Sequence, residues 1–150
     1  MRDPEHPYEI EFYDDPTTGT EPVRDWIRVE LTTYQRRALG VALYEVLQRN
    51  GVGVCGTEYG RQLGGGLFEF RLRHDADEII GKHTARTPHG EPDAGPILLR
   101  VFCHAHGRQV ILLLGGYDKA ADPNKQREAK EIALARSRLA EYRRRATMKG

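Results

Sequence analysis

Two stretches of this chain have the hydrophobic pattern of β-strands and yet carry an arginine in the middle. The first is Leu67–Arg73, with Arg71 inside it, and the second is Ile97–His104, with Arg100 inside it. An arginine in a buried strand costs free energy unless it is paired or faces a cleft. Because alternate residues of a strand share one face, the two stretches predict a sheet that carries a polar patch.

The rest of the chain predicts two more strands and three helices. Tyr8–Tyr13 alternates in polarity as a half-buried strand does, and Gln109–Leu114 is apolar on both faces, which is typical of a central strand. Glycine-rich Val52–Gly66 is interpreted as loop. The order β-α-α-β-β-β-α predicts an α+β fold with a four-stranded, mainly antiparallel sheet packed on helices. The predicted helices are Glu21–Leu31, a helix that starts after a capping box at Thr32–Gln35 and ends before Gly51, and a C-terminal helix capped by Asp122.

The length of 150 residues fits a single domain that covers residues 1–150. Residues 77–96 are rich in Gly and Pro, and we interpret them as an irregular insertion. No apolar run of about 18 residues is present, so we expect no membrane partner. The N-terminus lacks the apolar core of a secretion signal, and two cysteines make no disulfide framework, which favours a cytoplasmic protein.

The two ends of the chain carry opposite charge, although the net charge is only +1. Residues 1–30 contain nine acidic residues and three arginines, whereas residues 123–150 contain nine basic residues and three glutamates. A basic C-terminal segment indicates a polyanionic partner. The alternative is that the two ends neutralise each other or are simply solvated.

The polar side chains of the predicted strands suit phosphodiester chemistry. Arginine and lysine can bind phosphate oxygens and stabilise the extra negative charge of a pentavalent transition state. Tyrosine can stack on a nucleobase, and histidine, lysine or tyrosine can take part in proton transfer from a ribose 2′-hydroxyl. The structural alternatives are that Arg71 only pairs with Glu69 or with a carboxylate of a helix, and that His104 is an ordinary surface histidine. The five candidates are Arg71, Arg100, His104, Tyr117 and Lys119.

Metal and cofactor sites are not predicted. The histidines and cysteines do not follow the spacing of known zinc sites, and the glycines at 64–66 precede a strand rather than a helix, unlike a phosphate-binding loop. We therefore expect no metal and no cofactor. The side chains that could in principle ligate a metal are His83, His89, Cys103, His104 and His106.

Several short motifs follow one another between about Tyr8 and Arg144. With these motifs in this order, the chain resembles the RelE/ParE superfamily, most closely the phage Gp49-like/HigB family of type II toxin–antitoxin systems. The resemblance implies a RelE-like fold. The motifs are Glu11-Phe12-Tyr13, Pro22-Val23 with Trp26, Leu63 with Gly66–Arg71, Leu99–Phe102, Val110–Lys119, and a final helix with Pro123, Glu131-Ile132, Ala135, Arg138 and Tyr142.

The resemblance also implies an activity. Members of this family are ribosome-dependent endoribonucleases that cut mRNA without a metal, inhibit translation and are neutralised by a helix-turn-helix antitoxin. Carried over to this chain, Arg71 and Arg100 are phosphate and transition-state ligands. Lys119 is a phosphate contact or proton-transfer group, and Tyr117 stacks on a base or relays a proton. The residues expected to contact RNA or the ribosome are Arg73, Lys125, Arg127, Lys130, Arg136, Arg143 and Arg144.

Two alternatives to ribonuclease activity stay open. The related ParE branch shares the fold, inhibits DNA gyrase and cleaves no RNA. The second alternative is a regulatory binding module without catalysis.

Overall fold

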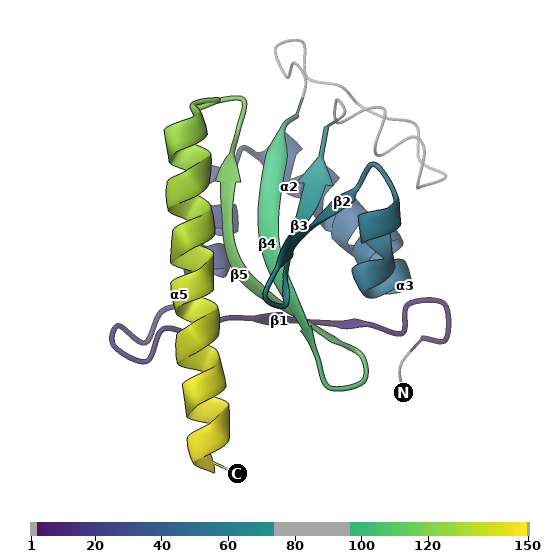
Figure 1. The fold of residues 1–150 in the computed structure, drawn as a ribbon. Coiled ribbons are helices and arrows are strands. Elements are labelled where there is room, and N and C mark those ends of the chain that lie inside the picture. The colour runs from purple at the N-terminus through teal and green to yellow at the C-terminus, as the bar shows by residue number, and fades with distance from the viewer. Residues whose placement is uncertain (1–2, 74–96, 150) are drawn as a thin grey trace.

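A computed structural model describes residues 3–73 and 97–149, and the predicted insertion at 77–96 lies outside this range. The fold is α+β, with one open sheet covered on both faces (Figure 1). Strands follow the order β1-β5-β4-β3-β2, in which β1 is parallel to β5 and the other neighbours are antiparallel. The strands are β1 (Glu9–Phe12), β2 (Gly60–Gly64), β3 (Leu67–Leu72), β4 (Leu99–His106) and β5 (Val110–Asp118).

Helical segments form two layers, one on each face of the sheet (Figure 1). The long C-terminal helix lies along one face, and the helices between β1 and β2 pack against the other. No helix in the described part of the chain is long and apolar enough to cross a membrane. The segments are α1 (Pro22–Asp25), the π-helix η1 (Trp26–Glu30), α2 (Thr33–Ala42), the π-helix η2 (Leu43–Leu47), α3 (Gln48–Asn50), the 3₁₀ helix η3 (Gly51–Gly56) and α5 (Lys125–Lys149).

The sheet has five strands, not the four that we predicted. The additional strand is β2, which lies within the segment Val52–Gly66 that we interpreted as loop, and it pairs antiparallel with β3. β2 is an edge strand with the exposed residues Arg61 and Gln62 in its middle, so it lacks the apolar alternation that identifies a half-buried strand. Its turn into β3 consists of three glycines with positive φ, a backbone conformation that other residues rarely adopt.

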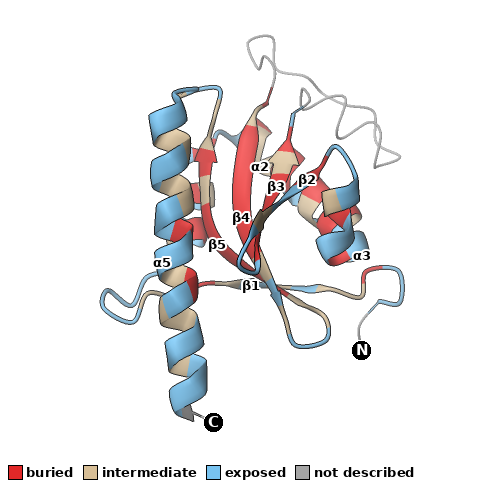
Figure 2. Ribbon diagram, viewed as in Figure 1, coloured by how far each residue is buried: buried red, intermediate tan, exposed pale blue. Residues whose placement is uncertain are grey.

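The sheet separates two apolar clusters, and β4 is buried on both faces (Figure 2). Phe68, Phe70 and Leu72 of β3 face α1 and α2, as the period-2 pattern predicted. Leu112 and Leu114 of β5 face α5 instead, together with Ala135 and Leu139 of that helix. The face toward α5 also carries the polar residues of β3 and β4, which is why this face contains the candidate site.

Two of the predicted helix signals are confirmed, and one is shifted. Thr32 and Gln35 form a reciprocal capping box, with a hydrogen bond of 3.1 Å from the Gln35 amide to Thr32 Oγ1. Gly51 follows α3 with φ of +54°, as expected for a helix-terminating glycine. Helix α5 begins at Lys125, and Asn124 rather than Asp122 accepts the Gln126 amide. Asp122 accepts the amide of Asn124 and so shapes the turn before the helix.

Gly116 of β5 is a position where the packing requires glycine. A Cβ atom there would lie 2.5 Å from Cζ3 of Trp26, whose ring packs against the strand. We predict that Gly116→Ala lowers the free energy of unfolding by about 1–3 kcal/mol in urea titrations, because a rigid ring must shift. Gly40→Ala is the matched control, since an added Cβ meets nothing within 4 Å in α2. It should raise stability by about 0.5–1 kcal/mol, and a similar loss for both variants would contradict the explanation.

Candidate functional site

A row of cross-strand neighbours brings three predicted site residues together beneath α5. In the antiparallel register, Arg71 of β3 pairs with Arg100 of β4, and Arg100 pairs with Tyr117 of β5. Directly opposite residues on adjacent strands point to the same side of a sheet, so the three side chains lie in one line. Lys119 follows Tyr117 at the end of β5. Of the five residues that we predicted to lie together, the structure brings Arg71, Arg100 and Tyr117 into one row, with Lys119 just beyond its end.

A buried carboxylate lies at the centre of this row. Glu69 of β3 is 1% exposed, and its Oε1 lies 3.2 Å from Nε of Arg71, 3.6 Å from Nε of Arg61 and 3.9 Å from Nε of Arg100. None of these contacts has hydrogen-bond geometry, and both carboxylate oxygens lack a hydrogen-bond partner. Arg71 thus makes an ion pair with Glu69, and this pair belongs to a larger charge cluster.

Helix α5 supplies the outer layer of the cluster. Oε1 of Glu128 lies 3.1 Å from Nη2 of Arg61, and Oε2 lies 3.6 Å from Nζ of Lys119. The guanidinium of Arg127 lies over the ring of Tyr117, 5.4 Å from its centroid. The first turns of α5 therefore lie over Tyr117 and contact Arg61 and Lys119. We name the whole group the arginine cluster, and its members are Arg61, Glu69, Arg71, Arg100, Tyr117, Lys119 and Glu128.

Burial determines how the groups of the arginine cluster ionise. Arg100 is 3% exposed, and its pKa is lowered first by burial and then by the nearby charges of Arg71 and Arg73, against the opposing effect of Glu69. The pKa of Arg71 is lowered by burial and by Arg73 as well. Arg100 also donates from Nη1 to the carbonyl of Leu99, at 3.2 Å. The cluster therefore holds cations at a high local density with one fully buried counter-charge.

The hydroxyl of Tyr117 is buried without a hydrogen-bond partner. The side chain is 1% exposed and its ring is stacked parallel to Phe102. Burial, followed by the charges of Glu128 and Glu69, raises the pKa of Tyr117 to about 12. At neutral pH this phenol is protonated and can donate a hydrogen bond or a proton, but it is a poor base.

The structure does not bring His104, which we predicted with the other four candidates, into the arginine cluster. Its Nδ1 donates to the carbonyl of Gly66, at 2.7 Å, in the turn between β2 and β3. The pKa of His104 is lowered by burial and by the charges of Arg143 and His106, so the imidazole is neutral at pH 7. Alternation placed His104 on the correct face, but it lies four residues along β4 from Arg100, beyond side-chain reach.

The residues predicted to contact RNA divide into exposed cations and cations that hold the fold. Arg136 donates to the carbonyls of Leu63 and Gly64, and Arg127 pairs with Asp122 and Glu131. Arg136 therefore fastens α5 to the end of β2, whereas Arg127 forms ion pairs within α5 and with the turn that precedes it. The others are exposed, which leaves their charges available to a polyanion. They are Arg73, Lys125, Lys130, Arg143 and Arg144.

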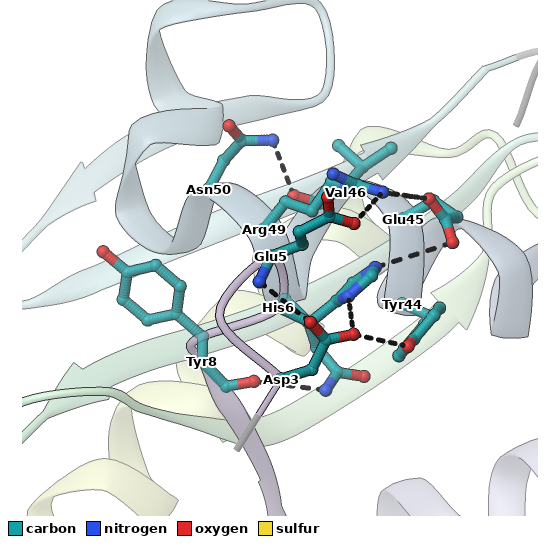
Figure 3. A network of polar contacts seen from close by, with 10 residues as sticks. Asp3, Glu5, His6, Tyr8, Tyr44, Glu45, Val46, Arg49 and Asn50 are labelled. Carbon is teal, nitrogen blue, oxygen red and sulfur yellow. Dashed lines mark hydrogen bonds and ion pairs between the residues drawn. The ribbon is translucent and has the colours of Figure 1, made fainter.

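A second polar network surrounds His6 near the N-terminus (Figure 3). Its Nδ1 lies 2.8 Å from Asp3 Oδ2, its Nε2 lies 3.5 Å from Glu45 Oε1, and its ring stacks on Tyr44. Asp3, Glu5 and His6 offer donor atoms within 4.8 Å of one another, the one group of this kind in the described residues. Asp3 already accepts from His6 and from the Glu5 amide. These contacts hold residues 3–6 against η2, so the network has a structural role.

Sequence reasoning missed Arg61, Glu128 and the central role of Glu69. Arg61 lies in the segment that we interpreted as loop, so no strand register was available to align it with Glu69. Glu128 belongs to a strongly basic segment, where a single glutamate gives no signal. The strand alternation does place Glu69 on the same face as Arg71. That three cations share this one buried carboxylate depends on how β2, β3 and β4 pack together, which no local sequence pattern encodes.

Comparisons with protein-family models, with curated proteins and with solved structures found no match for this chain.

The unpartnered hydroxyl of Tyr117 gives a first test of the site. We predict that Tyr117→Phe raises the free energy of unfolding by about 1 kcal/mol, because it removes a buried polar group that makes no hydrogen bond. Tyr13→Phe is the matched control, since Tyr13 is similarly buried but donates to Glu141 at 2.7 Å. It should lose about 1–2 kcal/mol. Equal losses in urea titrations would show that the hydroxyl of Tyr117 has a partner.

Glu69 gives a second test. Glu69→Gln leaves Arg100 and Arg71 without their buried counter-charge, so we predict a loss of about 3–5 kcal/mol in the free energy of unfolding. Glu128→Gln should cost at most about 1 kcal/mol, since its ion pairs with Arg61 and Lys119 are partly exposed to solvent. If both variants lose the same small amount, Glu69 is not the centre of the cluster.

Proposed function

We propose that this protein binds RNA through the arginine cluster and acts as a toxin of the RelE/HigB type, a ribosome-dependent endoribonuclease that inhibits translation. The observation that carries the proposal is the row of Arg71, Arg100 and Tyr117 on adjacent strands, with Lys119 at its end. The partners in this proposal are the ribosome with its mRNA and a helix-turn-helix antitoxin, in the cytoplasm. No metal or cofactor is invoked.

Solvent exposure within the cluster suits a phosphate that approaches from outside. The side chains of Arg61, Lys119 and Arg71 are 45%, 29% and 19% exposed, whereas Arg100 and Tyr117 lie beneath them. A phosphate oxygen can contact the outer three, and the charge of Arg100 adds to the potential from below. The extra negative charge of a phosphorane is stabilised by this arrangement of fixed cations.

The proton-transfer roles follow from the pKa of Tyr117. A phenol with a pKa of about 12 keeps its proton at neutral pH, which suits a donor to the leaving 5′-oxygen rather than a base for the 2′-hydroxyl. Lys119 is the phosphate contact beside it. His104 takes no part in this scheme, because its Nδ1 is occupied by Gly66 at the other end of β4.

Glu128 competes with RNA for the same cations. Its carboxylate pairs with Arg61 and Lys119, the two most exposed cations of the cluster. A phosphate must therefore replace Glu128 at this edge, and the exchange is inexpensive because partly exposed ion pairs contribute at most about 1 kcal/mol. Binding of a phosphate here requires the side chain of Glu128 to move away from Arg61 and Lys119.

A non-catalytic role is the second candidate, and the burial of Arg100 and Tyr117 favours it. Both side chains are almost fully buried, so neither reaches a substrate without a movement of Arg127 and Glu128. A ParE-like inhibitor of DNA gyrase or a regulatory binding module needs only the exposed cations. The two candidates differ in whether RNA is cut.

The decisive experiment maps the 5′ ends of a reporter mRNA in a purified translation system. Wild-type protein should create new 5′ ends only when ribosomes translate the message. We predict that Arg71→Ala and Lys119→Ala each reduce the cleavage rate about 100-fold, the typical cost of removing one transition-state ligand. Arg108→Ala, an exposed arginine outside the cluster, is the matched control and should leave the rate unchanged. Intact mRNA with folded wild-type protein would support the gyrase or binding-module alternative.

A further inference from the structure

The glycine turn between β2 and β3 lies beside α5 and is held by two basic side chains (Figure 1). Arg136 donates from Nη1 to the carbonyl of Gly64, at 3.0 Å, and from Nη2 to the carbonyl of Leu63, at 2.7 Å. His104 donates from Nδ1 to the carbonyl of Gly66, at 2.7 Å. All three acceptors are neutral carbonyls, so the charge of Arg136 meets no counter-charge in these contacts.

Arg143 brings a second guanidinium to the same turn. A Cβ atom added to Gly66 would overlap Nη2 of Arg143 and lie 3.2 Å from Nδ1 of His104, so both side chains lie against this glycine. The guanidinium of Arg143 is exposed and forms no hydrogen bond or ion pair with any residue that the structure describes. Because Arg143 follows Arg136 by two helical turns, both project from the same side of α5.

The carboxylates of neighbouring elements do not neutralise this group. Glu11 of β1 bonds to His106 at 3.1 Å, and Glu141 of α5 pairs with Arg145 at 2.8 Å. The rings of His106 and His104 are stacked, with centroids 6.2 Å apart, so Glu11 reaches this region only through His106. Two guanidinium groups without a carboxylate partner favour an oxyanion, and the planar fork of arginine matches a phosphate.

The turn lies on the same face of the sheet as the arginine cluster. His104 and Arg100 are four residues apart on β4, a separation of about 13 Å along the strand. Arg136 lies between the two groups along α5, since it follows Glu128 by eight residues and precedes Arg143 by seven. A stacked nucleic-acid strand places a phosphate about every 3.4 Å along its axis, so a strand bound at the cluster reaches the turn after about four nucleotides.

We infer that Arg136, Arg143 and His104 form a second phosphate-binding subsite for single-stranded RNA, a few nucleotides along the strand from the arginine cluster. The inference rests on the proposed function, since both sites take the same RNA. The phosphate held here is not the one that is cut. The subsite therefore adds affinity and sets the line along which RNA crosses the sheet, and it has no part in the cleavage step.

His104 makes binding at this subsite depend on pH. A carbonyl cannot donate, so Nδ1 carries the proton in the bond to Gly66, and Nε2 of the neutral ring is an acceptor that repels a phosphate oxygen. The pKa of His104 is lowered, chiefly by burial, whereas a bound phosphate favours the charged ring and raises that pKa. RNA affinity therefore increases as the pH falls below 7. The other titratable and charged groups around His104 are Arg143 and His106, and His106 in turn contacts Glu11 and Tyr142.

The first experiment measures binding of fluorescein-labelled 2′-O-methyl oligouridylates by fluorescence anisotropy, because such strands cannot be cut through a 2′-hydroxyl. A dinucleotide can occupy the arginine cluster alone, whereas an octanucleotide reaches both sites. Arg143→Ala should weaken binding of the octanucleotide about tenfold, the cost of one charged hydrogen bond, and leave the dinucleotide unaffected. Lys119→Ala should weaken both. Arg108→Ala, an exposed arginine of the β4–β5 turn, is the matched control and should change neither.

The second experiment repeats the octanucleotide titration at different pH values. Wild-type affinity should rise about threefold between about pH 7.5 and 5.5, because binding and protonation of the ring are linked. His104→Asn keeps a donor near the position of Nδ1 but cannot become charged, so it should lose this increase. The same increase in wild type and His104→Asn would overturn the assignment of His104 to the subsite.

The outcomes separate this inference from the proposed function. If Arg143→Ala binds the octanucleotide as tightly as Arg108→Ala does, while Lys119→Ala still weakens binding, the subsite is overturned and the arginine cluster keeps its role. Failure of wild-type protein to bind either strand would overturn both. The expected binding pattern without cleavage of mRNA would support the subsite and count against ribonuclease activity alone. Equally tight binding of an octaglutamate peptide would overturn the inference in favour of an acidic protein partner.

Discussion

The carboxylate of Glu69 is the charge that three strands share, because Arg61, Arg71 and Arg100 come from β2, β3 and β4 and all direct Nε toward it. Burial of a lone guanidinium is very costly, so the almost fully buried Arg100 depends most on this carboxylate, whereas Arg71 and Arg61 are partly open to water. The pair need not make the protein more stable than an apolar core would. It fixes instead which side chains meet, since a shift of one residue along β3 would move Glu69 to the other face.

Helix α5 depends on the same constraint and on polar contacts along its whole length. Its apolar stripe is narrow, and among its residues whose burial the structure describes only Ala135 and Leu139 are buried. Glu128 joins the arginine cluster near the start of the helix, Arg138 donates to the carbonyl of Leu114 midway, and Arg145 pairs with Asp14 near the end. The last contact links the basic end of the chain to the acidic end. The charge asymmetry is therefore partly internal neutralisation, while the exposed cations of α5 keep the capacity to bind a polyanion.

The parts of the fold that could be predicted are those encoded by local patterns. Alternation identified β3, β4 and the shared face of Arg71 and Arg100, and the capping box at Thr32 and Gln35 fixed the start of α2. β2 could not be predicted, because an edge strand with polar residues on its exposed side has no hydrophobic period. The full set of residues in the site could not be predicted either, for a related reason. Glu128 reaches Arg61 and Lys119 only through the packing of α5 on the sheet, and no spacing along the chain expresses that contact.

The arginine cluster has an inner part that is fixed and an outer part that can exchange partners. Glu69 and Arg100 are almost fully buried, so separating them costs the desolvation of both charges and ties their geometry to the folded state. Glu128, Lys119 and Arg61 are partly open to water, where a phosphate can take the place of a carboxylate at little cost. An anion-binding surface needs both properties, because rigid cations fix the potential while mobile ones close on the ligand. A cluster in which every charge was as buried as Glu69 would be only structural, and the exposure of Lys119 and Arg61 is what makes this one a candidate site.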